Sequence, residues 1–392
     1  MRVIGIISGT SFDAVEVAAA KLHLEDETVV MRPLGSISVD YEPDLRSAVA
    51  GMLPPAATSA EAVCKLDTRL GQAFAEAAVQ AANHLLDGPA DLVVSHGQTV
   101  YHWVENGKAL GTLQLGQPAW IAEHTGVPVV SDLRGRDVAA GGHGAPLVSL
   151  FDVLLLERGP ETRAALNLGG IANLTIVPEK DSPFAFDVGP ANALIDAAVD
   201  HFSGGSESYD KNGRRAARGE SHRELLQSLM EDPYFDQPPP KSTGKEYFNL
   251  SYLQERLRSF GRIPDDDVVA TVTRLTAETI SRDLRRHDVK EVVASGGGTS
   301  NPVLMSMLQD SAPNASVRPI EDWGIPSESK EAYAFAVLGF LTLHGLPGTV
   351  PACTGARRAR VLGNITPGEK PLVLPDAPES NPTRLRISPP EG

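Results

Sequence analysis

The 392-residue sequence has few cysteines and no long apolar run. Cys64 and Cys353 are far apart and outside any CxxC spacing, which argues against a disulfide framework or a cysteine-based metal site. No stretch reaches the ~18 consecutive apolar residues of a membrane helix, and Met1 and Arg2 lead directly into a strand-like segment. We therefore expect a cytoplasmic protein without a membrane partner.

Basic residues are also in the minority. The chain has 35 Lys and Arg against 50 Asp and Glu, and its formal net charge is -15. Nucleic-acid backbones are bound by Lys and Arg and repelled by an acidic protein, so we expect no nucleic-acid partner.

What the sequence does contain is an alternation of strand-like and helix-like segments. In the first half, residues 3–7, 15–24 and 91–95 are predicted strands, and a helix is predicted to begin at Thr58, with Glu61 completing a capping box. The second half repeats the pattern, with strands at 164–177, 184–187 and 291–295 and helices at 192–202, 267–287 and from 301. This alternation predicts an α/β fold made of two duplicated lobes around a central cleft.

The expected lobes are discontinuous in the chain. The first comprises residues 1–133, with about 346–370 folding back onto it, and the second comprises 134–345. Residues 371–392 are rich in Pro, Glu and Ser, which predicts a disordered tail.

The first candidate site is the bend in GIISGTSFDAVEV. Gly9, Thr10 and Ser11 are small enough for their backbone N–H groups to surround a phosphate, and Asp13 beside them suits Mg²⁺. The alternative is an ordinary hairpin turn with a turn-favouring Asp, which this stretch alone favours.

Two further glycine-rich bends follow strands in the second half. Each is either a phosphate-binding loop or a tight turn, and neither matches the P-loop or the dinucleotide-binding pattern. They comprise Gly169, Gly170 and Asn173 in NLGGIANLT, and Gly296, Gly297 and Gly298 in SGGGTSNP.

Asp187 in FDVGPAN is a candidate general base. It ends a predicted strand just before a helix, where catalytic groups collect in α/β sheets. The alternative is that it only satisfies loop N–H groups.

Polar residues in SHGQTVYH and SDLRGRDVAAGGHGAPL are candidates for substrate binding. His96 and Gln98 suit hydrogen bonding to a substrate, although a lone His is as often structural. Arg134, close to Asp137 in the sequence, is suited to bind a carboxylate or phosphate, unless the two residues form only a surface ion pair.

The segment PPPKSTGKEYFNL, residues 238–250, is by default an exposed lysine-rich loop, and the alternative is that it contacts phosphate or ribose.

Together these segments resemble the anhydro-N-acetylmuramic acid kinase family. The resemblance rests on GTSFDAVEVA, SHGQTVYH, NLGGIANLT, FDVGPAN, ASGGGTSNP and, most specifically, PPPKSTGKEYFNL and LPGTVPACTGA, which occur in the family's order over about residues 3–368. It implies a two-lobed actin-like, or RNase H-like, ATPase fold and a possible homodimer.

The resemblance also implies a reaction. In the family, ATP, Mg²⁺ and water convert 1,6-anhydro-N-acetylmuramic acid into N-acetylmuramic acid 6-phosphate, a step in peptidoglycan recycling. Asp187 matches the base that deprotonates the water. The other matching positions are Gly9, Thr10, Ser11 and Asp13, then Gly169, Gly170 and Asn173, for phosphates; Gly296, Gly297 and Gly298 for adenosine; Asp13 and Glu331 for the metal; and His96, Arg134 and Asp137 for the sugar.

Five positions differ from the residues usual in the family, namely Ala14, Glu16, His143, Val188 and Ala191. Two alternatives therefore stay open. One is the same reaction on another anhydro-sugar such as levoglucosan, and the other is a non-catalytic protein that binds a sugar or nucleotide.

Overall fold

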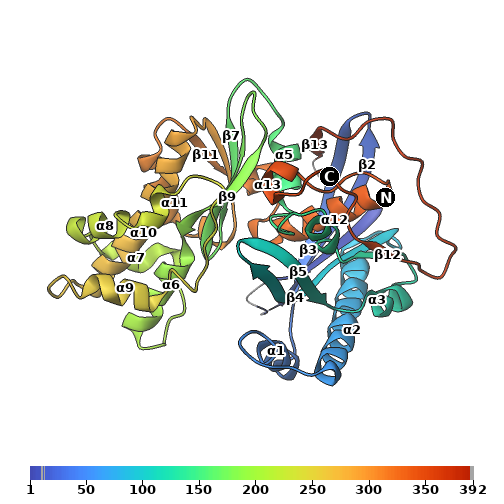
Figure 1. The fold of residues 1–392 in the computed structure, drawn as a ribbon, viewed down its shortest axis with the longest axis horizontal. Coiled ribbons are helices and arrows are strands. Elements are labelled where there is room, and N and C mark those ends of the chain that lie inside the picture. The colour runs from blue at the N-terminus through green and yellow to red at the C-terminus, as the bar shows by residue number, and fades with distance from the viewer. Residues whose placement is uncertain (10–11, 13, 389–392) are drawn as a thin grey trace. The chain divides into compact units, whose positions relative to one another are not determined.

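The computed structural model describes residues 1–9, 12 and 14–388. It divides the chain into two compact units, which we call unit 1 (Met1–Glu157 with Trp323–Gly392) and unit 2 (Arg158–Asp322). Both are mixed α/β structures (Figure 1). The predicted positions Thr10, Ser11 and Asp13 lie outside the described residues.

Unit 1 contains one mixed sheet with strand order β12-β6-β4-β1-β2-β3-β13, and β5 pairs with β4. Its strands are β1 (Arg2–Ser8), β2 (Ala14–Glu25), β3 (Thr28–Asp40), β4 (Leu92–Glu105), β5 (Lys108–Leu115), β6 (Val129–Ser131), β12 (Asn364–Thr366) and β13 (Arg384–Ile387). Its helices are α1 (Pro43–Ala50), α2 (Ala60–Leu85), α3 (Pro118–Thr125), α4 (Gly135–Ala139), α5 (Ser149–Leu156), α12 (Lys330–Leu343) and α13 (Pro351–Thr354).

Helices α2 and α12 pack on opposite faces of this sheet (Figure 1). Ile4 and Ile6 of β1 belong to the core that includes the α2 side chain Phe74. Gly5, between them, faces the other way, because side chains alternate along a strand. A Cβ at Gly5 would lie 2.0 Å from the backbone oxygen of Ala332 in α12, so glycine is required for this close approach.

Unit 2 contains a five-stranded sheet with order β11-β10-β7-β8-β9. Its strands are β7 (Arg163–Leu168), β8 (Ile171–Val177), β9 (Phe184–Pro190), β10 (Glu291–Ser295) and β11 (Ser316–Pro319). Its helices are α6 (Asn192–Ser203), α7 (Arg214–Arg218), α8 (Arg223–Met230), α9 (Leu250–Leu257), α10 (Asp265–Arg286) and α11 (Pro302–Ser311). Helix α10 contributes apolar side chains to both the core under the sheet and the core among the helices.

The two sheets share one topology. In each, three consecutive strands are antiparallel (β1-β2-β3 and β7-β8-β9), and two more are added in parallel beside the first (β4-β6 and β10-β11). If β5, which pairs with β4, is left out of the count, both sheets have the strand order third-second-first-fourth-fifth. This confirms the predicted duplicated actin-like, or RNase H-like, α/β fold.

Three expectations differ from the structure. Helix α2 is capped by Ser59, whose side chain accepts from Ala62 N, rather than by Thr58. Residues 384–387, expected to be disordered, form β13 and pair with β3, because Leu385 is buried there. The predicted lobe boundaries at 133/134 and 345/346 differ from the observed division, because α4, α5 and α12 pack in unit 1.

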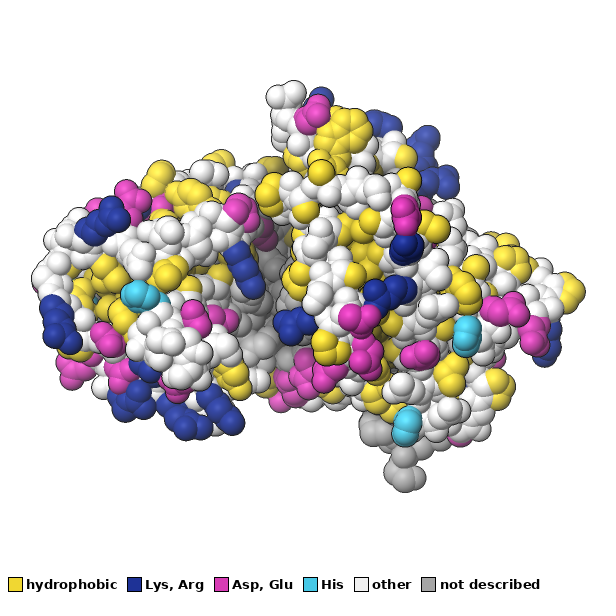
Figure 2. Space-filling model, turned by 90° about the horizontal axis from the view of Figure 1, so that it is seen from below, with side chains coloured by type: hydrophobic (Ala, Val, Ile, Leu, Met, Phe, Trp, Pro, Cys, Tyr) yellow, Lys and Arg dark blue, Asp and Glu magenta, His cyan; other side chains and the backbone are white. Residues whose placement is uncertain are grey.

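Acidic and basic side chains are interspersed with apolar ones over the face drawn in Figure 2. No helix in the described ranges, 1–9 and 14–388, is both long and apolar enough to cross a membrane.

Candidate active site

Asp187 lies in β9 and is half-buried. Its Oδ2 accepts two hydrogen bonds from the segment before α9, from Ser242 Oγ (2.9 Å) and from Thr243 N (3.0 Å). The backbone is held as well, since Asp187 N donates to Lys241 O at 3.1 Å and Tyr234 donates its hydroxyl to Asp187 O at 2.7 Å. The carboxylate is thus fixed through one oxygen, and the structure gives no hydrogen bond to Oδ1 among the described residues.

The surroundings of Asp187 favour a proton acceptor. Burial raises the pKa of its carboxyl above the usual aspartate value, and the hydrogen bonds from Thr243 and Ser242 oppose that rise. A carboxylate with a raised pKa binds a proton more readily than one in water, which is what general-base catalysis requires.

The second glycine-rich bend lies directly beside Asp187. Asn173 of β8 pairs with Asp187 of β9 in the antiparallel ladder. Gly169 and Gly170 connect β7 to β8, and their carbonyl oxygens accept from Asn192 N (3.1 Å) and Ala193 N (3.0 Å) at the start of α6. The structure therefore brings together three of the predicted phosphate positions and the predicted base.

The third bend borders a pocket of about 520 Å³ within unit 2. Gly297 lines it together with Asn192, Asp196 and Asn301. Gly296 and Gly298 instead permit close packing on β7, since Cβ atoms there would lie 2.5 Å from Asn167 Oδ1 and 2.7 Å from Leu168 Cβ. Only one of the three predicted glycines therefore faces the pocket.

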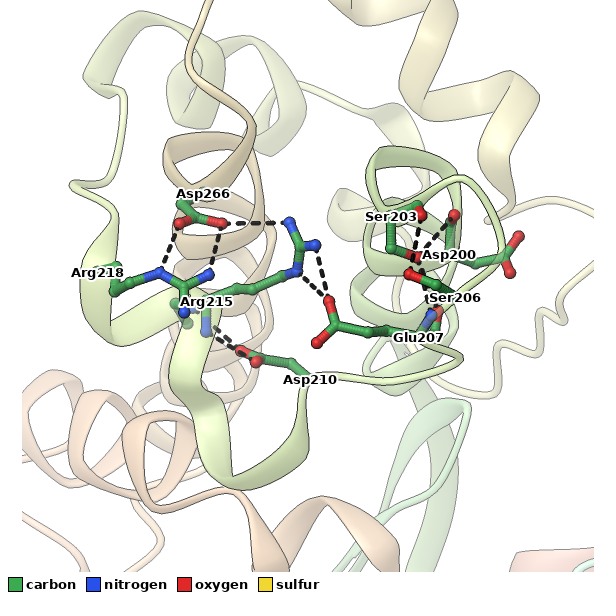
Figure 3. Close-up of polar contacts among 9 residues, drawn as sticks. Asp200, Ser203, Ser206, Glu207, Asp210, Arg215, Arg218 and Asp266 are labelled. Atoms are coloured by element: carbon green, nitrogen blue, oxygen red, sulfur yellow. Dashed lines mark hydrogen bonds and ion pairs between the residues drawn. The ribbon is translucent and has the colours of Figure 1, made fainter.

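An ion-pair network lies beside residues 208–212, which also line this pocket (Figure 3). Asp210 accepts from the backbone N–H groups of Arg215 (2.8 Å) and Ala216 (3.0 Å). The Arg215 guanidinium contacts Glu207 at 2.7 Å and Asp266 of α10 at 3.3 Å. These contacts anchor residues 208–212 to α7 and α10.

The predicted sugar-binding residues lie in unit 1. Arg134 Nε donates to His96 Nε2 at 2.7 Å, and Arg134 Nη1 donates to Gly144 O at 2.7 Å. His96 therefore carries its proton on Nδ1, which donates to Gly97 O. Burial, with the nearby Arg134 charge, lowers the pKa of His96 to about 3. His96 is thus a neutral, buried acceptor that orients Arg134.

Asp137 is fully buried, and its carboxylate is hydrogen-bonded to other parts of the chain. Its Oδ2 accepts from Gly144 N and its Oδ1 from Thr354 Oγ1, both at 2.8 Å. With both oxygens engaged, Asp137 fastens the glycine-rich loop to the segment around α13 instead of presenting a free carboxylate to solvent.

Two further predicted positions, Glu331 and Gly9, also lie in unit 1. Glu331 lies in the first turn of α12; desolvation raises the pKa of its carboxyl, and the Arg134 and Lys330 charges oppose that rise. Gly9 O accepts from Phe12 N at 3.1 Å and from Gln98 Nε2 at 3.5 Å. Gln98 is buried and also accepts from Ser8 Oγ, so it supports the opening bend from within the protein.

The family model described as anhydro-N-acetylmuramic acid kinase matches residues 1–368. The chain belongs to the anhydro-N-acetylmuramic acid kinase family. Relatives of that name from Streptomyces coelicolor and Rhodococcus erythropolis are 57% and 51% identical, each over 99% of this chain and 99% of the relative. One from Streptomyces avermitilis is 57% identical over 98% of this chain and 99% of the relative. The predicted family resemblance is confirmed.

At two positions where this chain differs from the residues usual in the kinase family, the side chain is buried. Val188 and Ala191 are both completely buried, in the core under the unit 2 sheet. Their side chains therefore contribute to packing and present no group to a ligand.

The sequence reasoning missed Ser242 and Thr243. Their segment was expected by default to be an exposed lysine-rich loop, yet they hold Asp187. The specificity of PPPKSTGKEYFNL for the kinase family was the sequence feature that could have identified them.

Proposed function

We propose that this chain is an ATP-dependent kinase that opens the 1,6-anhydro ring of 1,6-anhydro-N-acetylmuramic acid and phosphorylates O6. The product is N-acetylmuramic acid 6-phosphate, formed during the recycling of cell-wall fragments. The observation that carries the proposal is the Asp187 carboxylate, held through Oδ2 and with a raised pKa.

Asp187 acts as the general base in this reaction. Its Oδ1 accepts a proton from a water molecule as the water oxygen attacks C1 of the sugar, and the C1–O6 bond breaks. The freed O6 then attacks the γ-phosphorus of ATP, and ADP leaves. Ser242 and Thr243 keep the carboxylate oriented throughout, because they bind the oxygen that does not receive the proton.

Arg134 is proposed to bind the carboxylate of the sugar. Its Nε and Nη1 groups are committed to His96 and Gly144, which fixes the plane of the guanidinium. A guanidinium held in this way suits a planar carboxylate through its remaining N–H groups. This assignment favours the muramic sugar over levoglucosan, which has no carboxylate.

The nucleotide is proposed to place its adenosine in the unit 2 pocket beside Gly297 and its phosphates at the Gly169–Gly170 bend. Mg²⁺ would neutralise phosphate charge, and it takes few carboxylates together with water and phosphate oxygens. Glu331 is the predicted ligand among the described residues. Asp13, the other predicted ligand, lies outside the described residues.

The substrate proposal is tested by a panel of sugars. With ATP and Mg²⁺, the purified protein is expected to release ADP when 1,6-anhydro-N-acetylmuramic acid is added and to give a 6-phosphate product by mass spectrometry. Release with levoglucosan alone would show a different substrate. Sugar binding without ADP release would show a protein that binds but does not react.

Ser242→Ala is expected to shift the pH dependence of kcat. The Ser242 hydroxyl stabilises the ionised form of Asp187, so its removal raises the Asp187 pKa further. The base acts only when ionised, so activity is lost as pH falls through this pKa, and the acid limb moves to higher pH. Ser47→Ala, which removes an exposed hydroxyl on α1, is the control. An acid limb identical to that of the wild type would disprove this role.

A further inference from the structure

The space over Gly170 is occupied by the side chain of Lys245. A Cβ atom at Gly170 would lie 2.5 Å from Lys245 Cε and 3.4 Å from Nζ. The Lys245 side chain is nevertheless exposed, and no carboxylate in the described part of the chain lies within ion-pair distance of it. Its ammonium group therefore lies near the bend and is open to solvent.

The backbone amides at the start of α6, next to the bend, are already engaged. The N–H groups of Ala191, Asn192 and Ala193, at the start of α6, already donate to the carbonyl oxygens of Gly169 and Gly170. These amides are consequently unavailable to a phosphate. Positive charge from a side chain would add to the attraction of the bend for an anion, and Lys245 is a cation that lies there.

The loop that carries Lys245 is anchored on both sides. On one side, Lys241 O accepts from Asp187 N. On the other, the N–H groups of Tyr247 and Phe248 donate to Gly244 O at 3.1 Å, and Phe248 is fully buried. Because Ser242 and Thr243 of the same loop hold the Asp187 carboxylate, the position of Lys245 is tied to that of the base.

We propose that Lys245 binds the nucleotide phosphates at the Gly169–Gly170 bend, an inference that rests on the kinase function proposed above. The Lys245 charge also acts on Asp196, which lines the pocket. Burial raises the pKa of Asp196 to about 6, and the Lys245 charge opposes that rise. The Lys245 side chain thus lies over the bend while its charge acts on a residue of the pocket, and one nucleotide would extend from the pocket to the bend.

The inference is tested by calorimetric titration of ATP and of adenosine, without sugar. Lys245→Met is expected to weaken ATP binding about 10- to 100-fold, the usual effect of losing a hydrogen bond to a charged group. Adenosine affinity should stay unchanged, because it has no phosphate, and this also shows that the variant is folded. Lys245→Arg should keep most of the ATP affinity. Lys180→Met, at an exposed lysine of the same unit, is the control.

A double-mutant cycle tests the position of Lys245. Gly170→Ala would displace the Lys245 side chain, so it is expected to weaken ATP binding in the wild type and to add little in the Lys245→Met background. Additive losses would show that the two positions act independently and would overturn the proposed placement.

The two proposals fail in different ways. If the wild type turns over the sugar and Lys245→Met binds ATP as tightly as the wild type, the Lys245 inference alone is overturned. If the wild type neither binds ATP nor releases ADP, the kinase proposal fails and the inference fails with it.

Discussion

Asp187→Asn is expected to lower kcat at least about 10²-fold, the smaller end of what a positioned general base contributes. An amide has nearly the same shape as the carboxylate but cannot accept the proton of the attacking water. Ser242 Oγ and Thr243 N can still donate to the amide oxygen, so the loop around residue 187 should keep its conformation. The measurement is the steady-state rate of ADP release at saturating sugar and ATP.

The matched control for this change is Asp200→Asn, on the exposed side of α6 in the same unit. It should leave kcat unchanged, and Asp187→Asn should leave ATP affinity unchanged, since Asp187 is assigned to the water and not to the nucleotide. A kcat for Asp187→Asn close to that of the wild type would remove Asp187 from the reaction.

The pH dependence of the wild type follows from the same residue. Because burial raises the Asp187 pKa, the base becomes protonated at a higher pH than an exposed aspartate. The rate should therefore decline as pH falls through this raised value. His96 should add no limb near neutrality, since its pKa of about 3 keeps it uncharged there.

Local patterns were enough to predict much of this fold. In each half, a strand, a glycine-containing bend and a second strand follow one another directly in the sequence. Strands β1, β2, β7 and β8 lie where the apolar alternation predicts them. Asp187 was predicted to end a strand, whereas β9 continues to Pro190 and Asp187 lies in its middle. A strand near the C-terminus was missed, because Pro and charged residues dominate the composition around β13 while its pairing with β3 is non-local.

The contacts that define the site could not be predicted in the same way. Ser242 and Thr243 reach Asp187 across 55 and 56 residues, and Thr354 reaches Asp137 across 217. The periodicity of one segment carries no information about such pairs. For the same reason Asp137 resembled a ligand-binding residue in the sequence, whereas its burial and its two hydrogen bonds show a structural role.

A buried ion pair at the start of α12 carries the largest expected effect on stability. Lys330 Nζ lies 2.7 Å from Asp152 Oδ1 of α5, and the two side chains are only 6% and 8% exposed. Lys330→Met would leave the Asp152 carboxylate buried without the Lys330 charge. Breaking such a pair from one side typically costs about 3–5 kcal/mol of unfolding free energy, because a buried charge is left uncompensated.

Chemical denaturation of Lys330→Met should therefore show a clearly lower midpoint than that of the wild type. Lys65→Met is the control, since Lys65 and Glu61 form an exposed pair on α2 that is worth at most about 1 kcal/mol. The double variant Lys330→Met with Asp152→Leu should recover much of the loss, because replacing both charges by apolar groups removes the desolvation penalty along with the attraction. If Lys330→Met unfolds at the midpoint of the control, the pair does not stabilise unit 1. If the double variant is as unstable as the single one, then packing and not charge explains the loss.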